Sequence, residues 1–272
     1  MTSPTRTSFL RSDVYRAIIL ATALAGSIFL TAHVSYNPPP PKTFSFLETV
    51  PANGSSITVS DVTGSIFAAS WSQPQVLING SIVVTGEGAT PDNVQIQENN
   101  VGGSIYFRPS YFDRTLGRGY LVDVNLYLPS KTSFASIGLQ AVDAGVIHLG
   151  PLNDSHISVE TWAGNITMAL NPNPSGDYSI ATHNGGNINL KVPETSSFTL
   201  QAVSGLGYYG QVTVHGFDQC QVDLSPARYM LGNTRATITC SDHTANVEVN
   251  TDYTVTPQGG YITVGDITVS SV

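Results

Sequence analysis

The chain has 272 residues, of which 41% are hydrophobic and 11% charged, with a formal net charge of −8. This length is sufficient for one large all-β domain or two small ones, and the hydrophobic fraction is sufficient for a packed core. The low charged fraction indicates a surface of Ser, Thr, Asn, Gln and Gly, which suits an extracellular protein. The acidic balance excludes nucleic acid as the expected partner, because phosphates require a basic surface.

An apolar run at residues 17–34 follows a segment, residues 1–16, that contains three arginines. This charge order predicts a cytoplasmic segment at 1–16, a signal anchor or transmembrane helix at 17–34 and an exported C-terminus. The protein is then membrane-bound with a single pass, or secreted if the segment is a cleaved signal peptide. A third alternative is an archaeal pilin-type leader, because residues 16–19 read Arg-Ala-Ile-Ile.

Residues 35–43 form a proline-rich segment that contains four consecutive prolines. Consecutive prolines favour polyproline II, which is an extended and semi-rigid spacer. We interpret this segment as a linker that holds a folded ectodomain, residues 44–272, away from the membrane. A plain domain boundary is the alternative, and it places the start of the domain at the same point.

From Phe44 onward the sequence predicts strands and turns, because short apolar/polar alternations are separated by Gly, Asn, Asp and Pro. A recurring unit places a small residue, often Gly, one or two positions before an Ile or Val. Several neighbouring copies are 16 to 26 residues apart, and examples are Gly64-Ser65-Ile66, Gly145-Val146-Ile147, Gly164-Asn165-Ile166 and Gly186-Asn187-Ile188.

Short strands with a period near twenty residues predict an all-β, solenoid-like or β-helical stack of coils. In this interpretation Gly or Asn supplies the unusual backbone angles of a corner, and the following Ile points inward. Ile147, Ile166 and Ile188 should then share one buried apolar column. A β-sandwich, whose strands recur every 8 to 12 residues, is the alternative.

Cys220 and Cys240 are the only cysteines of the chain. An even pair in an exported protein predicts a disulfide. About one coil apart in the sequence, the two residues would lie on adjacent strands roughly 4.8 Å apart, which a disulfide can bridge. Two buried free thiols are the alternative.

A longer internal repeat carries a resemblance to a known family. The stretch LKVPETSSFTLQAVSG, Leu190 to Gly205, is similar to its partner at Leu126 to Gly145, and both occur among the serial Gly-x-Ile corners. Together they resemble the family named putative adhesins, over about residues 44–267. The resemblance implies a β-solenoid-like fold and an exported or membrane-anchored protein. The family has no established catalytic residues, so none is carried over.

The chain contains no motif that demands catalysis, a cofactor or a metal. Its six histidines are isolated, and no zinc-ligand spacing or phosphate-binding glycine loop occurs. Asn250-Thr251-Asp252 resembles a fragment of polygalacturonases, but the order relative to His215-Gly216 is reversed and no adjacent Asp pair exists. We therefore expect no enzyme, no cofactor and no metal site.

One stretch of the acidic ectodomain is both basic and aromatic, the segment Tyr106–Tyr120. Tyr and Arg are enriched at binding hot spots, so the segment is a candidate partner surface; an end cap over the core is the alternative. The candidate residues are Tyr106, Phe107, Arg108, Tyr111, Phe112, Arg114, Arg118 and Tyr120.

Four asparagines begin an Asn-x-Ser/Thr sequence, which is the acceptor for N-glycosylation. They are Asn53, Asn79, Asn153 and Asn165, about as many as the composition gives by chance. They are candidate modification sites in a host with the required machinery.

Taken together, the sequence predicts a membrane-anchored or secreted, non-enzymatic protein with an adhesin-like ectodomain and a structural or adhesive role. The expected partners are the membrane, through the N-terminal helix, and a glycan or a surface protein. The alternatives are a carbohydrate-active β-solenoid enzyme and a cell-envelope sensor that binds a protein.

Overall fold

The computed structural model describes residues 39–272 except 53–55, 113–117, 143–144, 153, 155, 206–209, 229–231, 241–244 and 256–261. Two compact units divide the chain, Met1–Pro40 and Pro41–Val272. The segments predicted at 1–16 and 17–34 lie outside the described residues. Within the part that is described, none of the helices has the length and apolar character needed to cross a membrane.

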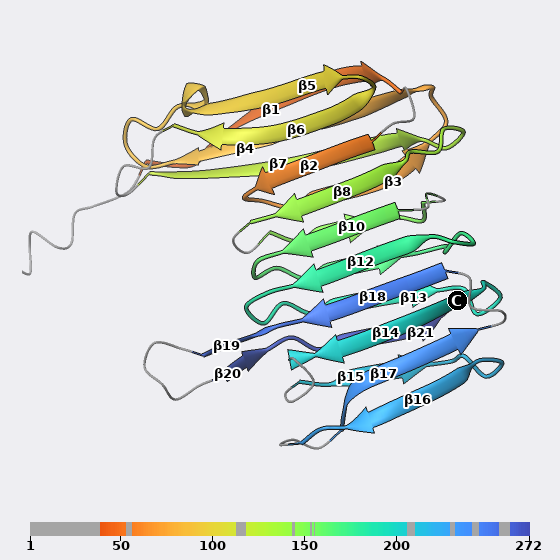
Figure 1. Cartoon of the computed structure of the whole chain (residues 1–272). Coiled ribbons are helices and arrows are strands. Elements are labelled where there is room, and N and C mark those ends of the chain that lie inside the picture. The colour runs from red at the N-terminus through yellow and green to blue at the C-terminus, as the bar shows by residue number, and fades with distance from the viewer. Residues whose placement is uncertain are drawn as a thin grey trace, which may run out of the picture. The chain divides into compact units, whose positions relative to one another are not determined.

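The described part of the second unit is built from strands, as the sequence predicts, with one short 3-10 helix, η1 (Pro91–Asn93) (Figure 1). The strands in chain order are β1 (Lys42–Pro51), β2 (Ser56–Val62), β3 (Ile66–Trp71), β4 (Gln75–Thr85), β5 (Val94–Val101), β6 (Ser104–Tyr111), β7 (Gly119–Pro129), β8 (Ser136–Ala141), β9 (Ile147–Leu149), β10 (His156–Thr161), β11 (Ile166–Ala169), β12 (Asp177–Thr182), β13 (Ile188–Val192), β14 (Phe198–Ser204), β15 (Val212–His215), β16 (Gln221–Pro226), β17 (Asn233–Cys240), β18 (Ala245–Thr251), β19 (Tyr253–Val255), β20 (Ile262–Val264) and β21 (Ile267–Ser271).

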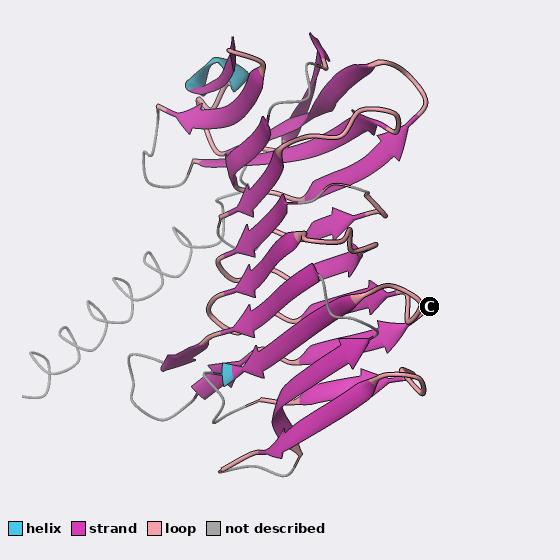
Figure 2. Cartoon of the chain, turned by 45° about the vertical axis from the view of Figure 1, so that its right-hand side comes forward, coloured by secondary structure: helices cyan, strands magenta, loops and turns pink. Residues whose placement is uncertain are grey.

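Two large sheets of mixed pairing contain nearly all of these strands. Sheet A has the order β1-β4-β7-β3-β9-β11-β13-β21-β15, and sheet B has the order β16-β17-β14-β18-β12-β10-β8-β2-β6-β5. Strands β19 and β20 form a separate antiparallel hairpin. Figure 2 shows the sheets as two layers of strands. The central strands are parallel, which differs from the antiparallel pairing of the sandwich alternative.

The chain passes repeatedly from a strand of sheet B to a strand of sheet A, and we call each such pair a unit. Units β2–β3, β8–β9, β10–β11 and β12–β13 lie side by side in chain order. Two other units are out of order. Unit β6–β7 lies on the far side of β2–β3, and the C-terminal unit β18–β21 lies between β12–β13 and β14–β15. The stacking of units therefore departs from a simple succession along the chain at both ends.

In-register pairing produces continuous apolar columns between the sheets. Ile147 pairs with Ile166, which pairs with Ile188, and each is at most 1% exposed. The predicted column is thus confirmed. Ile66 extends it at one end and Ile267 at the other. Because every residue of the column contacts the same position of the next unit, the core is one continuous apolar layer.

Three of the corner glycines serve a different purpose from the one predicted, whereas Gly103 and Gly210 of the same recurring unit have the predicted positive φ. Gly145, Gly164 and Gly186 are absent from the described residues that have positive φ, so they do not supply unusual backbone angles. A Cβ at Gly164 would instead overlap the carbonyl oxygen of Gly145, and a Cβ at Gly186 would overlap that of Gly164. Glycine is required because the corners of neighbouring units approach each other at backbone distance.

Buried hydroxyl groups complete the same corners. Thr161 Oγ1 donates to the Gly145 carbonyl at 2.9 Å, and Thr182 Oγ1 donates to the Gly186 carbonyl at 2.6 Å. Thr251 Oγ1 donates to the carbonyl of Gly265 at 2.9 Å. These threonines are register partners on β10, β12 and β18. They satisfy buried carbonyl groups of the tight turns, and the Gly265 carbonyl also accepts from Ser204 Oγ.

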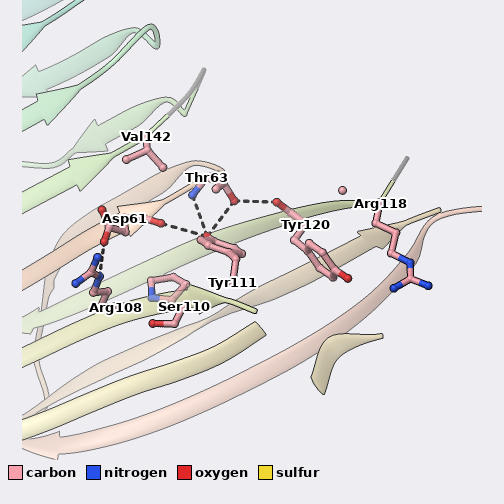
Figure 3. A pocket seen from close by; sticks show the side chains of 10 residues that line it. Asp61, Thr63, Arg108, Ser110, Tyr111, Arg118, Tyr120 and Val142 are labelled. Carbon is pink, nitrogen blue, oxygen red and sulfur yellow. Dashed lines mark hydrogen bonds and ion pairs between the residues drawn. The ribbon is translucent and has the colours of Figure 1, made fainter. Parts of the chain in front are cut away.

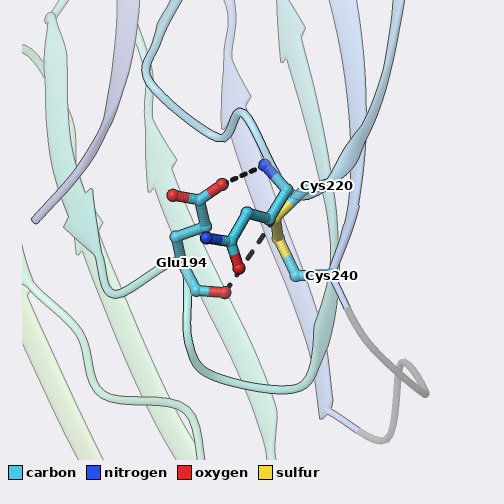
Figure 4. The surroundings of a disulfide bond; sticks show 4 residues. Glu194, Cys220 and Cys240 are labelled. Atoms are coloured by element: carbon cyan, nitrogen blue, oxygen red, sulfur yellow. Dashed lines mark hydrogen bonds between the residues drawn. A yellow bond between two sulfur atoms is a disulfide. The ribbon is translucent and has the colours of Figure 1, made fainter.

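The structure joins Cys220 and Cys240 in a disulfide, as the sequence predicts, with 4.5 Å between the Cα atoms. The predicted placement one coil apart is wrong, however. Cys240 ends β17 and Cys220 directly precedes β16, and these two strands form an antiparallel pair at the edge of sheet B. Figure 4 shows the bond beside Glu194, whose carboxylate accepts a hydrogen bond from the Gln219 backbone N–H. The disulfide closes the outermost hairpin of the stack.

A buried charge in the isoleucine column should unfold the stack. Ile166→Asp places a carboxylate among apolar side chains, and we expect it to lower the free energy of unfolding by at least about 3 kcal/mol. Thr167→Asp is the matched control, because Thr167 is exposed on the other face of the same strand. It should change stability by about 0.5 kcal/mol or less. Chemical denaturation monitored by circular dichroism gives both values, and equal stability of the two variants would contradict the assigned faces.

Loss of the disulfide should destabilise the outer hairpin first. The double variant Cys220→Ser/Cys240→Ser removes a link between residues 20 positions apart, which stabilises by about 3 kcal/mol in the chain-entropy model. Limited proteolysis followed by mass spectrometry should place the earliest new cleavages of the variant within residues 216–240. Earliest cleavage within β8 to β13 would contradict this assignment.

Candidate binding groove

A groove of about 730 Å³ opens where the predicted aromatic segment meets the corners of two neighbouring units (Figure 3). Strand β6, Arg118 and the start of β7 supply one side, and the end of β2 with Thr63 and Val142 supplies the other. The lining residues are Asp61, Thr63, Arg108, Pro109, Ser110, Tyr111, Arg118, Gly119, Tyr120 and Val142.

The Tyr111 hydroxyl fixes the floor of this groove. It donates to the Asp61 carbonyl at 3.1 Å and lies 3.1 Å from Thr63 Oγ1. Thr63 Oγ1 in turn donates to the Tyr120 carbonyl at 3.1 Å. Figure 3 shows these groups converging from three segments of the chain. Both tyrosines are thus held rigidly, because the Tyr120 hydroxyl also accepts a hydrogen bond from Asn93 Nδ2 at 2.7 Å.

A backbone irregularity directs Asp61 toward Arg108. The register of β2 against β8 shifts between Val59 and Val62, and Asp61 has a φ of 56°. A bulge of this kind re-aims a side chain, and left-handed backbone is unfavourable for a non-glycine residue. The Asp61 carboxylate forms an ion pair with the Arg108 guanidinium, and its charge raises the pKa of Arg108. The groove therefore holds an internally compensated charge pair.

The structure brings together four of the eight residues predicted as a partner surface: Arg108, Tyr111, Arg118 and Tyr120. The prediction is wrong for Phe107, which is 0% exposed and stacks on Phe46 with 5.7 Å between ring centroids. Alternation along β6 turns this side chain into the core.

Two further described residues of the predicted surface, Tyr106 and Phe112, do not line the groove. Phe112 is 67% exposed, and Tyr106 accepts a hydrogen bond from Ser60 at 3.3 Å on the outer face of sheet B. Arg114 lies outside the described residues. Sequence proximity alone could not decide which side chains of the segment face the groove, and the partner surface stays a prediction.

A second polar cluster lies further along the stack, and no sequence motif indicated it. His183 Nδ1 lies 3.1 Å from Asp252 Oδ2, and Nε2 lies 2.9 Å from Glu160 Oε1. The Trp162 ring lies against the imidazole, with 5.4 Å between centroids, and Trp162 is 51% exposed. Glu160 also accepts a hydrogen bond from Gln140 at 3.2 Å. These residues are far apart in sequence, and the stacking of units brings them together.

The pKa of His183 is raised by the two carboxylates. Burial is the largest single influence and lowers the pKa, but the hydrogen bonds to Asp252 and Glu160, with the charges of both, together outweigh it. In its protonated form the imidazole donates from both N–H groups and links Glu160 of β10 to Asp252, which follows β18. Among the described residues no group of three or more acidic, His or Cys side chains is arranged to hold a metal ion.

Two of the predicted glycosylation sites lie in the described part of the chain. Asn79 lies within β4, and its Oδ1 accepts a hydrogen bond from Asn125 Nδ2 at 2.9 Å. Asn165 is an exposed corner residue whose Oδ1 accepts from the Asn187 backbone N–H at 2.8 Å. Asn53 and Asn153 lie outside the described residues. Glycosylation of these sites stays a prediction.

Solved structures similar to this chain are described as adhesins or cell adhesion proteins, the family that the sequence resembles. A "putative cell adhesion protein" from Clostridium sporogenes is 12% identical, with 85% of this chain and 100% of that chain covered and a TM-score of 0.44. "Putative adhesins" from Bacteroides fragilis and Parabacteroides distasonis are 8% and 12% identical, each with 85% of this chain and 97% of the other covered, and with TM-scores of 0.30 and 0.26. No family model and no curated protein matches the chain.

The His183 cluster predicts a pH-dependent contribution to stability. Because the folded-state pKa is raised, this contribution is fully present below the unfolded value of about 6.5 and is lost as the pH rises through the folded value. The stability advantage of the wild type over His183→Gln should therefore shrink as the pH rises above about 6.5. We expect a change below about 1 kcal/mol, because the cluster is partly exposed.

Thermal unfolding at several pH values measures this difference. His148→Gln is the control, since His148 is exposed on β9 in sheet A. A wild-type advantage over His183→Gln that grows with pH would contradict the assigned ion pairs.

Proposed function

We propose that the chain is a non-enzymatic, adhesin-like protein of the cell surface that binds a partner through the groove beside β6 and β7. The groove carries this proposal, because it concentrates rigid tyrosines and arginines in an otherwise acidic chain. Rigid amphipathic rings and guanidinium groups supply much of the binding energy at recognition surfaces. The partner is a glycan or a surface protein.

An exported location is part of the same proposal. The disulfide supports it, because such bonds persist in oxidising compartments. The apolar run at 17–34 would anchor the protein in the membrane or, if cleaved, direct its secretion. The linker at 35–43 would lead directly into the folded part, where β1 begins at Lys42.

The finer description of the fold is a solenoid-like stack. Parallel, in-register pairing of successive units supports it, and the antiparallel strands at both ends would act as caps. Such a stack has a natural structural role, because it presents corner side chains in rows over an extended surface. An adhesive function uses a rigid surface of this kind.

The non-enzymatic assignment rests on how the carboxylates of the groove and of the His183 cluster are used. Glycoside hydrolysis needs one carboxylic acid and one carboxylate on either side of the reacting bond. Asp61 is paired with Arg108, and Glu160 and Asp252 are both bonded to His183. Each of these charges is committed to a neighbouring side chain, which favours binding over proton transfer.

Substitutions that fill the groove with a bulky side chain and reverse the charge of one of its arginines should abolish adhesion. The double variant Ser110→Trp/Arg118→Glu alters two lining residues, and we expect at least about ten-fold fewer bound particles when beads carry the full-length variant. The assay counts beads attached to cells of the organism that makes the protein.

The control carries the same two substitutions elsewhere. Ser225→Trp/Arg235→Glu changes a cross-strand pair on the exposed edge of sheet B. It should bind like the wild type. Equal loss of binding in both double variants, or in neither, would remove the groove from the proposed function.

A further inference from the structure

One side chain directly follows each of five neighbouring sheet B strands, β2, β8, β10, β12 and β18, and we call these residues the corner row. Backbone hydrogen bonds fix the alignment: Val142 N donates to Val62 O at 2.7 Å, Trp162 N to Ala141 O at 3.3 Å, His183 N to Thr161 O at 2.9 Å and Asp252 N to Thr182 O at 3.0 Å. Neighbouring strands are about 4.8 Å apart, so the row runs along the stack. Its members are Thr63, Val142, Trp162, His183 and Asp252.

The corner row joins two hollows into one surface. Thr63 and Val142 line the groove of about 730 Å³ beside β6 and β7. Val142 also lines a second hollow of about 380 Å³, together with Trp162, Ala163 and Asn184. The concave surface therefore continues past the groove toward Trp162. A ligand that fills both hollows must be extended along the stack rather than compact.

The chemistry of this surface is that of aromatic rings beside planar polar groups. Trp162 is half exposed, and its ring packs against the His183 imidazole. The Glu160 carboxylate contacts Nε2 of this imidazole, and the Asp252 carboxylate contacts Nδ1. A pyranose ring presents C–H groups on its faces and hydroxyl groups at its edge. The faces pack on an aromatic ring, whose π surface is negative, and the hydroxyls donate to carboxylate and amide oxygens.

We propose that one extended, neutral saccharide chain binds along the corner row, with Trp162 as the stacking platform for one of its sugars. This deepens the proposed function and rests on it, because the same groove receives the rest of the chain. A neutral ligand is favoured over a polyanion because Asp61 neutralises Arg108, while the two carboxylates beside His183 leave that cluster with a net negative charge.

A protein partner fits this surface less well. Cores of protein interfaces are enriched in aromatic residues and Arg but depleted of Asp and Ser. The two hollows place Asp61, Thr63, Ser110 and Asn184 among their aromatic and guanidinium groups, and only Pro109, Val142 and Ala163 are aliphatic. A hydroxyl-rich polymer matches this composition along its whole length.

The test titrates the full-length protein with neutral linear oligosaccharides of glucose, N-acetylglucosamine, mannose and galactose, each from two to eight sugars long. Calorimetry should detect binding of at least one series, with an affinity that rises about ten-fold or more from the dimer to the hexamer. Trp162→Ala should lower that affinity about ten-fold or more, and Trp162→Phe should retain most of it. Thermal unfolding checks that both variants are folded.

Trp71→Phe is the matched control, because the Trp71 ring packs on Tyr127 in sheet A, with 5.9 Å between centroids, away from the corner row. It should bind the oligosaccharides like the wild type. Equal affinities of the Trp162→Ala and Trp71→Phe variants would overturn the proposal.

Binding of none of the neutral series would also overturn it, as would binding of oligogalacturonate alone, which would indicate a polyanion. If adhesion then still depends on Ser110 and Arg118, the partner is of another class and the proposed function stands. If adhesion is indifferent to those residues, the proposed function fails as well.

Discussion

Close approach of neighbouring corners is the constraint on which the rest of this structure depends. Parallel strands pair in register only if the turns between the sheets also stack at strand spacing, and this brings the carbonyl of Gly145 against the Cα of Gly164. Only a residue without a Cβ fits there. The hydroxyl of Thr161 then satisfies the Gly145 carbonyl. Sterics and hydrogen bonding thus fix each corner relative to the next, and the isoleucine column and the corner row follow from that alignment.

At each end of the stack the last parallel strand has an edge with unpaired backbone groups, which could pair with another chain and cause aggregation. At one end β4 and β1 pair antiparallel beyond β7, and β5 pairs antiparallel with β6. At the other end β17 and β16 extend sheet B beyond β14, and the disulfide closes that hairpin. Strand β16 remains largely exposed and ends in Pro226, which cannot donate a backbone hydrogen bond. The antiparallel hairpins therefore act as caps for the apolar layer.

Much of the local structure could be predicted from the sequence because it depends on local patterns. Alternation identified the strands, and the Gly-x-Ile corners identified Ile147, Ile166 and Ile188 as one column. The cysteine pair also followed from composition and context. Phe107 was misassigned because aromatic content, rather than the alternation along β6, was used to select surface residues.

The order of the units could not be predicted, because any unit with an apolar column can stack on any other. Nothing in the sequence of β18–β21 distinguishes a place at the end of the stack from one between β12–β13 and β14–β15. The repeated sequence Leu-Gln-Ala-Val, at 139–142 and 200–203, does not predict the register. Through the intervening strands Leu139 aligns with Ala202 rather than with Leu200, so the two copies are offset by two residues. The Glu160–His183–Asp252 cluster depends on this order, because Asp252 reaches His183 only when β18 lies beside β12. A functional constellation of this kind becomes visible only with the topology.

Disulfide cross-linking between β13, β21 and β15 tests the inserted position of the C-terminal unit most directly. Asn189 and Thr268 are register partners, and Thr213 is the partner of Thr268 on its other side. Neighbouring positions are about 4.8 Å apart and a disulfide can bridge them, whereas positions two strands apart are too distant. We predict that mild oxidation links the pair Asn189→Cys/Thr268→Cys in non-reducing peptide maps and leaves Asn189→Cys/Thr213→Cys unlinked. Linkage of Asn189→Cys/Thr213→Cys without linkage of the first pair would show that the units stack in chain order, and it would contradict the insertion of β18–β21 between β12–β13 and β14–β15.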